Sequence, residues 1–253
     1  MTDAITQSAS SVPPWPGFTV PLKCAMLAPM IKMRHFIAVA RLAAILAAAS
    51  TGLASATTSS LLAMAPAGTL TYDVMRQGER IGVHTMSFDR MGDELTVRTE
   101  TNVDFTAYIV FNITWTHQSV EVWSDNGLKE FTSFTNEDGR ERQVHAQRNG
   151  DHLIVNSTGG KREFPADLLP GTLWHPETVT QRQVLDPIKG RLRRVNIADQ
   201  GLEQIEVEGR KVNAHHYAMR GELTRDFWYD QDGTIVKVEF PITDGSEVTL
   251  LLR

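Results

Sequence analysis

From Thr69 to the C-terminus, apolar and polar residues alternate along the chain. The alternation is clearest over residues 111–123, where Trp115 and Trp123 occupy odd-numbered positions and Thr114 and Thr116 occupy even ones. A period of two predicts strands with one half-buried face. Turn residues such as Asp125-Asn126-Gly127 separate the runs at hairpin spacing. The sequence therefore predicts antiparallel strands joined by short turns.

The alternation breaks between Phe164 and Asp186, where three prolines exclude a central strand. Pro176 suits the first turn of a short helix, with Glu177 near its positive end. Such a segment can cover a sheet whose inner face would otherwise be exposed. We predict an all-β fold, a strongly curved antiparallel sheet of about 11 strands, in the form of a half-barrel or open barrel. A short helix and a Pro-rich loop cover it.

The N-terminal residues have the pattern of an export signal. A basic stretch around Lys32 and Arg34 precedes an apolar run, and Ala54-Ser55-Ala56 supplies small residues for cleavage. We expect residues 1–56 to form an extension and a cleavable signal, with the true start at Met33 as an alternative. Residues 57–68 would be a flexible mature N-terminus, and residues 69–253 a single β domain. A retained anchor is the competing interpretation, but the apolar run is shorter than the roughly 20 residues that span a bilayer.

Cleavage changes the formal charge. Removing four Lys or Arg residues and one Asp takes it from −5 to −8, which disfavours nucleic acid and anionic membranes as partners. The single cysteine, Cys24, lies before the cut, so the mature domain has neither a disulfide nor a thiol nucleophile. We expect a protein of the Gram-negative periplasm with no stable membrane span after cleavage.

Three stretches carry a family resemblance. They are Leu185-Asp186-Pro187-x-x-Gly190, Glu208-Gly209-x-x-Val212-x-Ala214-x-His216-Tyr217 and Trp228-Tyr229-Asp230-x-x-Gly233-x-Ile235-Val236-Lys237. With them, the chain resembles a family of exported bacterial proteins of unknown function. Related families share the curved half-barrel of periplasmic lipoprotein carriers, so the resemblance implies a similar fold and suggests an apolar cargo. It implies no catalytic residues.

No catalytic, metal or cofactor motif stands out. Adjacent strand residues point to opposite faces, so His215 and His216 cannot chelate one ion together. We therefore expect no cofactor, no metal and no enzymatic activity. The rival hypothesis is a hydrolase-type enzyme, whose donors would be His117, His175, His216 and Asp226 if the fold brought them together.

Aromatic and leucine side chains give the better functional lead. They would form the concave face of the sheet and a leucine-rich lid, and they bind a hydrophobic small molecule or lipid in this hypothesis. The same side chains can also pack simply as core. A further alternative is a module that binds an envelope protein partner. The candidate ligand-binding residues are Phe111, Trp115, His117, Trp123, Leu168, Leu169, Leu173, Trp174, His175, Trp228 and Phe240.

Overall fold

The computed structural model describes residues 64–107 and 111–253. The expected signal, its cleavage site and most of the expected flexible stretch lie outside the described residues. Within these ranges, fourteen strands form one sheet, and the all-β prediction is confirmed with fourteen strands in place of about eleven. No helix in the same ranges is both long and apolar enough to cross a membrane.

The elements follow one another along the chain as hairpins, interrupted once by a short helix. They are β1 (Gly68–Arg76), β2 (Glu79–Met91), β3 (Glu94–Ala107), β4 (Phe111–Ser124), β5 (Gly127–Glu137), β6 (Arg140–Asn149), β7 (His152–Ser157), β8 (Gly160–Pro165), the 3₁₀ helix η1 (Pro176–Thr180), β9 (Gln183–Leu185), β10 (Leu192–Val207), β11 (Arg210–Gly221), β12 (Arg225–Tyr229), β13 (Ile235–Pro241) and β14 (Glu247–Leu252).

The sheet is antiparallel throughout, and its order is β8-β7-β6-β5-β4-β3-β2-β1-β14-β13-β12-β11-β10-β9. Only one neighbouring pair, β1 with β14, joins strands that are far apart in sequence. Through this pair, the N-terminal and C-terminal runs of hairpins become one surface. Strands β8 and β9 end the order and do not pair with each other among the described strands, so the sheet is open.

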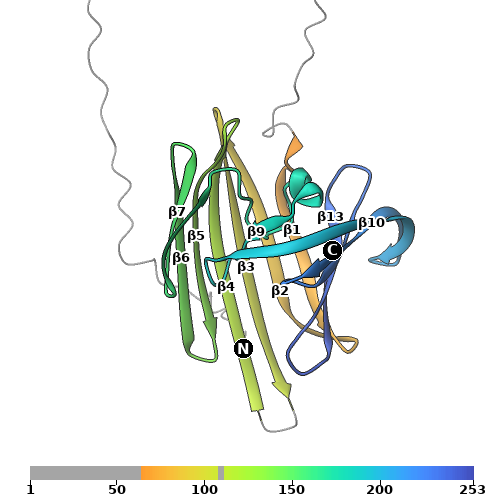
Figure 1. Cartoon of the computed structure of the whole chain (residues 1–253). Coiled ribbons are helices and arrows are strands. Elements are labelled where there is room, and N and C mark those ends of the chain that lie inside the picture. Colours follow the sequence, from red (N-terminus) through yellow and green to blue (C-terminus); the bar gives the residue numbers. More distant parts are fainter. Residues whose placement is uncertain (1–63, 108–110) are drawn as a thin grey trace, which may run out of the picture. The chain divides into compact units, whose positions relative to one another are not determined.

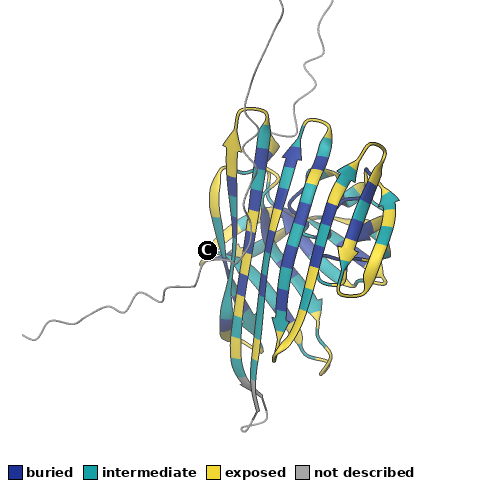
Figure 2. Ribbon diagram, turned by 90° about the vertical axis from the view of Figure 1, so that its left-hand side faces the viewer, coloured by how far each residue is buried: buried dark blue, intermediate teal, exposed yellow. Residues whose placement is uncertain are grey.

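The predicted alternation is visible as burial along the strands. In β5, Phe131, Ser133 and Thr135 are buried while the residues between them are half-buried. Figure 2 shows the same banding of buried and more exposed positions on the other long strands. One side of each strand therefore packs into the interior, as the period of two requires.

The two halves of the sheet share one core. Figure 1 shows β10 running across the N-terminal strands, close to perpendicular to them in that view. The main buried cluster joins Phe131 and Val144 of the N-terminal half to Phe227 and Val238 of the C-terminal half. The sheet must therefore curve until its own ends face each other. We call the side that carries these residues the inner face.

Three strands are poorly marked by the alternation of apolar and polar residues. β8 is an exposed edge strand in which apolar residues are rare, so hydrophobic alternation cannot reveal it. β9 is only three residues long. β10 runs without a break from Leu192 to Val207 although its middle is polar, and it pairs with β11 through a bulge between Asp199 and Gly201.

Gly82 of β2 occupies a point of close backbone approach. A Cβ atom at this position would lie 2.2 Å from the carbonyl oxygen of Asn102 on β3. Only glycine fits, because the opposing atom belongs to the backbone of a paired strand and cannot move aside.

Candidate functional site

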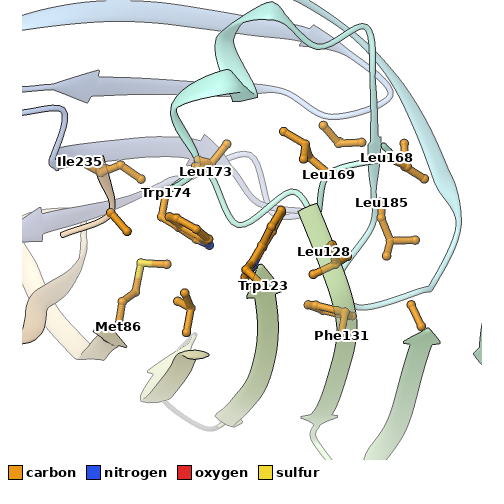
Figure 3. Close-up of a cluster of buried hydrophobic side chains, with 14 of the residues drawn as sticks. Met86, Trp123, Leu128, Phe131, Leu168, Leu169, Leu173, Trp174, Leu185 and Ile235 are labelled. Atoms are coloured by element: carbon orange, nitrogen blue, oxygen red, sulfur yellow. The ribbon is translucent and has the colours of Figure 1, made fainter. Parts of the chain in front are cut away.

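The cover segment, residues 166–191, closes one end of the interior. Its leucines Leu168, Leu169 and Leu173 are between 2% and 6% exposed, and they join the main core cluster. Trp123 of β4 and Trp174 of the cover segment meet edge to face, with ring centroids 5.4 Å apart. Figure 3 shows these side chains packed between the strands and the cover segment. This end is filled by protein.

Glu121 is a fully buried carboxyl group inside that filled end. Its Oε2 accepts hydrogen bonds from the indole Nε1 of Trp123 at 2.8 Å and of Trp174 at 2.9 Å. Burial raises the pKa of Glu121, although the indoles and the Thr172 side chain favour the charged form. Oε1 has no hydrogen bond of normal geometry among the described residues. The carboxyl group therefore fastens the cover segment to β4 through Trp174.

His175 adds an aromatic contact to the same end. Its ring lies 4.9 Å from the Trp123 ring, and its Nδ1 accepts from the backbone N–H of Glu177 at the start of η1. Burial lowers the pKa of His175 to about 4, so the ring is neutral near pH 7. His175 therefore caps the predicted helix and packs in the core.

The other end of the inner face is less filled. Trp115, Val103, Phe105, Phe240 and Leu250 are half-buried although they point inward or pack against the core clusters. The register explains this grouping, because Val103 lies opposite Trp115, and Phe105 follows on the same side of β3. We call this group of five side chains the open end. Apolar surface here remains in contact with solvent, which is the opposite of the filled end.

Two histidines border the open end. His84 of β2 and His117 of β4 flank β3, where both pair with Thr101. The Nδ1 of His84 lies 2.7 Å from the Thr101 hydroxyl, and the Nδ1 of His117 lies 2.8 Å from the Thr135 hydroxyl. Within the described chain, neither Nε2 has a hydrogen bond. Each ring is therefore fixed in orientation while one nitrogen stays available.

Burial and neighbouring positive charge hold both histidines neutral. Burial is the larger cause and lowers the pKa of each ring to about 4. The positive charge of Arg225 contributes in both cases. The Phe240 ring beneath Arg225 packs against the same cluster as Val103, two residues after Thr101. The Trp115 ring is nearly parallel to the His117 ring, with centroids 5.7 Å apart, and forms the adjoining part of the open end.

Arg225 of β12 reaches this region from the opposite half of the sheet. It alternates with Phe227 and Tyr229, both of which belong to the main core, so its side chain points to the inner face. Its Cζ lies 5.4 Å from the centre of the Phe240 ring. Among the described residues the guanidinium has neither an ion pair nor a hydrogen bond. Asp186 is near enough to influence it but is bound to Arg193 at 2.7 Å.

Trp228 lies on the other side of the sheet. It packs with Val207, Ala214 and Val236 in a separate cluster, and its ring stacks on His216 with centroids 4.3 Å apart. Its position follows from alternation, because Trp228 stands between the inward-facing Phe227 and Tyr229. Grouping Trp228 with the inner aromatic residues was therefore wrong.

The same outer face carries a pair that the enzyme hypothesis named. His216 Nε2 lies 2.8 Å from Asp226, and His216 Nδ1 lies 2.8 Å from Glu203. Arg220 also binds Asp226 at 2.8 Å. Because carboxylates occupy both ring nitrogens, His216 has no nitrogen left for a substrate. His117 and His175 face the interior and do not join this network.

The eleven sequence candidates thus separate into distinct groups. Trp115 and Phe240 belong to the open end and His117 borders it, six others lie at the filled end, and Trp228 lies on the outer face. Phe111 begins β4, but its side chain is not among those described. No group of three or more potential metal-binding side chains occurs in the described ranges. The six residues of the filled end are Trp123, Leu168, Leu169, Leu173, Trp174 and His175.

Sequence reasoning missed His84, Glu121 and Arg225 as site residues. Each was detectable, because each is a polar residue at an inward position of an alternating strand. Glu121 follows Trp115 and His117 on the same face of β4, and Arg225 precedes Phe227. The useful signal is the charged residue that interrupts an apolar face.

Comparisons with known proteins give a match to a solved structure and a match to a family model. A crystal structure of a β-barrel-like protein of the domain of unknown function DUF1849 from Brucella abortus is 13% identical, with a TM-score of 0.49. That match covers 73% of this chain and 97% of the other. No protein with a curated description matches. Residues 72–253 match the model of the domain of unknown function DUF6134, and the chain therefore belongs to the DUF6134 family.

Proposed function

We propose that this protein is exported to the periplasm, where it binds an apolar ligand such as an acyl chain at the open end of the inner face. The observation that carries the proposal is the group of half-buried apolar side chains there: Trp115, Val103, Phe105, Phe240 and Leu250. The export signal supports the location.

Desolvation supplies the affinity. Each Å² of apolar ligand surface removed from water stabilises the complex by about 25 cal/mol, less the cost of association. The filled end supports a fixed site, because Trp174 and its bond to Glu121 hold the cover segment against β4. A ligand then occupies the open end without displacing the core. Binding is favoured over catalysis because His216 and Asp226, the pair that most resembles a catalytic one, lie on the outer face, where carboxylates occupy both ring nitrogens of His216.

Two tryptophans provide a matched test. Delipidated protein is titrated with Nile red, whose emission shifts to the blue in apolar surroundings, and the dye is then displaced with palmitate. We expect uptake by the wild type, weaker uptake by Trp115→Ala, and unchanged uptake by Trp228→Ala, since Trp228 is on the outer face. Circular dichroism checks that both variants fold. Absence of uptake by the wild type, or an equal loss in both variants, would contradict the proposal.

A further inference from the structure

Arg225 presents an unusual combination of features for an inward-pointing cation. It is half-buried, lies over the Phe240 ring at 5.4 Å, and has no carboxylate partner within the described residues. Charges that lie partly out of water in proteins are usually paired, because burial makes an isolated charge costly. A half-buried guanidinium without a protein partner keeps its N–H donors available to an anion.

The two histidines add neutral donors to the same place. Their Nδ1 atoms are occupied by Thr101 and Thr135, which leaves each Nε2 to meet a ligand. When the threonine hydroxyl donates to Nδ1, Nε2 carries the proton and becomes a hydrogen-bond donor. The site then combines one positive charge with uncharged donors, in a wall that Trp115 and Phe240 make apolar.

The nearest negative charge does not satisfy Arg225. Asp186 accepts from Arg193 and from the backbone N–H groups of Ile188 and Lys189, so its oxygens are already used. The guanidinium of Arg193, whose Nη2 lies 2.7 Å from Oδ2 of Asp186, neutralises the charge of that carboxylate. The charge of Arg225 therefore remains available to a ligand.

We infer that Arg225, His84 and His117 form an anion clasp that binds the monoanionic head group of an apolar ligand, a carboxylate or a phosphodiester, at the open end. This inference rests on the proposed function and specifies its ligand class. A single guanidinium matches a single negative charge, so a dianionic phosphomonoester is a poorer fit. The head group forms bidentate bonds with Arg225, and the chain lies along Val103, Phe105 and Leu250.

The test compares three probes that each carry one acyl chain and differ in the head group. Palmitate and methyl palmitate share one chain, and lysophosphatidylglycerol carries its single charge on a phosphodiester. Dissociation constants are measured by displacement of Nile red for the wild type, Arg225→Gln and a matched control, Arg220→Gln. Arg220 lies on the neighbouring strand β11, is exposed, and binds Asp226 on the outer face.

The wild type is expected to bind palmitate at least about tenfold more tightly than methyl palmitate, since charge-assisted hydrogen bonds contribute about that much or more. Arg225→Gln loses this preference, binds the ester as before, and Arg220→Gln matches the wild type. A preference for lysophosphatidylglycerol over palmitate also supports the clasp and identifies its head group as a phosphodiester.

Two results overturn the inference in distinguishable ways. Equal affinity of the wild type for palmitate and methyl palmitate removes the clasp and leaves the proposed function standing. This comparison needs no variant, so it decides the matter even if Arg225→Gln fails to fold. If the wild type binds none of the three probes, the proposed function fails, and the clasp fails with it.

Discussion

Replacing Glu121 tests whether a buried carboxyl group fastens the cover segment to the sheet. Glu121→Ala removes the acceptor shared by the Trp123 and Trp174 indoles, which lie 2.8 and 2.9 Å from Oε2. A buried donor without a partner costs about 1 to 3 kcal/mol, so two donors imply a loss of about 2 to 6 kcal/mol. Glu121→Gln keeps an oxygen acceptor, and we expect it to lose less than about 1 kcal/mol.

The stability that Glu121 contributes depends on pH. Burial raises the pKa of Glu121 above its ordinary value of 4.5, so the folded state holds the proton more tightly than the unfolded chain does. The stability from this group is fully present below pH 4.5 and declines as pH rises through the pKa of the folded state. Each unit of the shift corresponds to about 1.4 kcal/mol. Glu121→Gln removes the decline, so its stability relative to wild type improves with rising pH.

Urea unfolding followed by tryptophan fluorescence, repeated across the acid and neutral range, measures both effects. Glu206→Gln is the control, because Glu206 is an exposed carboxylate on β10. The reasoning is refuted if the Ala and Gln variants of Glu121 lose equal stability at neutral pH. It is also refuted if the difference between Glu121→Gln and wild type stays constant with pH.

Three further predictions concern the core and its margins. Trp174→Ala is expected to destabilise the fold by about 3 to 5 kcal/mol in urea unfolding, because a 3% exposed indole leaves a cavity. His117→Asn should make the fold less sensitive to acid. Burial lowers the pKa of His117 from 6.5 to about 4, so the wild type loses up to about 3 kcal/mol of stability as pH falls from 6.5 to 4. Thermal unfolding measured across this pH range reports the difference between variant and wild type. Gly82→Ala should lower the free energy of unfolding by about 2 kcal/mol or more, and with it the melting temperature. Gly159→Ala should change neither, because a Cβ atom there would meet nothing closer than 3.6 Å.

The strands and turns were predictable because their signals are local. Alternation over residues 111–123 identified β4, and Asp125-Asn126-Gly127 identified the turn after it, where Gly127 adopts a φ of 98°. Both features follow from side-chain direction and backbone sterics within a few residues. Pro176 likewise indicated the first turn of η1.

The division of the interior into a filled and an open end was not predictable in this way. It depends on the pairing of β1 with β14 and on the curvature that brings Phe227 of β12 into one cluster with Val97 of β3 and Trp123 of β4. These relations join residues more than a hundred positions apart, and alternation gives no distance between such residues. Alternation shows only on which face of the sheet a side chain lies. Applied along β12, it places Trp228 on the face opposite to Phe227 and Tyr229, and would have excluded it from the inner aromatic residues.

Edge strands illustrate another limit. β8 has an exposed, charged sequence that protects the end of the sheet, so the property that makes it a good edge also hides it from a hydrophobic pattern. β9 is missed for a different reason, because Val184 and Leu185 form too short an apolar run to be distinguished from a loop. Their existence depends on their neighbours in the sheet.

Native mass spectrometry of the protein, isolated without delipidation from cells that produce it, is the decisive test of ligand binding. We expect an added mass that collisional activation releases as an apolar compound with one acidic group, and a lower occupancy by that compound in Arg225→Gln but not in Arg220→Gln. Recovery of the bare polypeptide mass alone, under conditions that preserve the complex of a known fatty-acid carrier, would contradict the account.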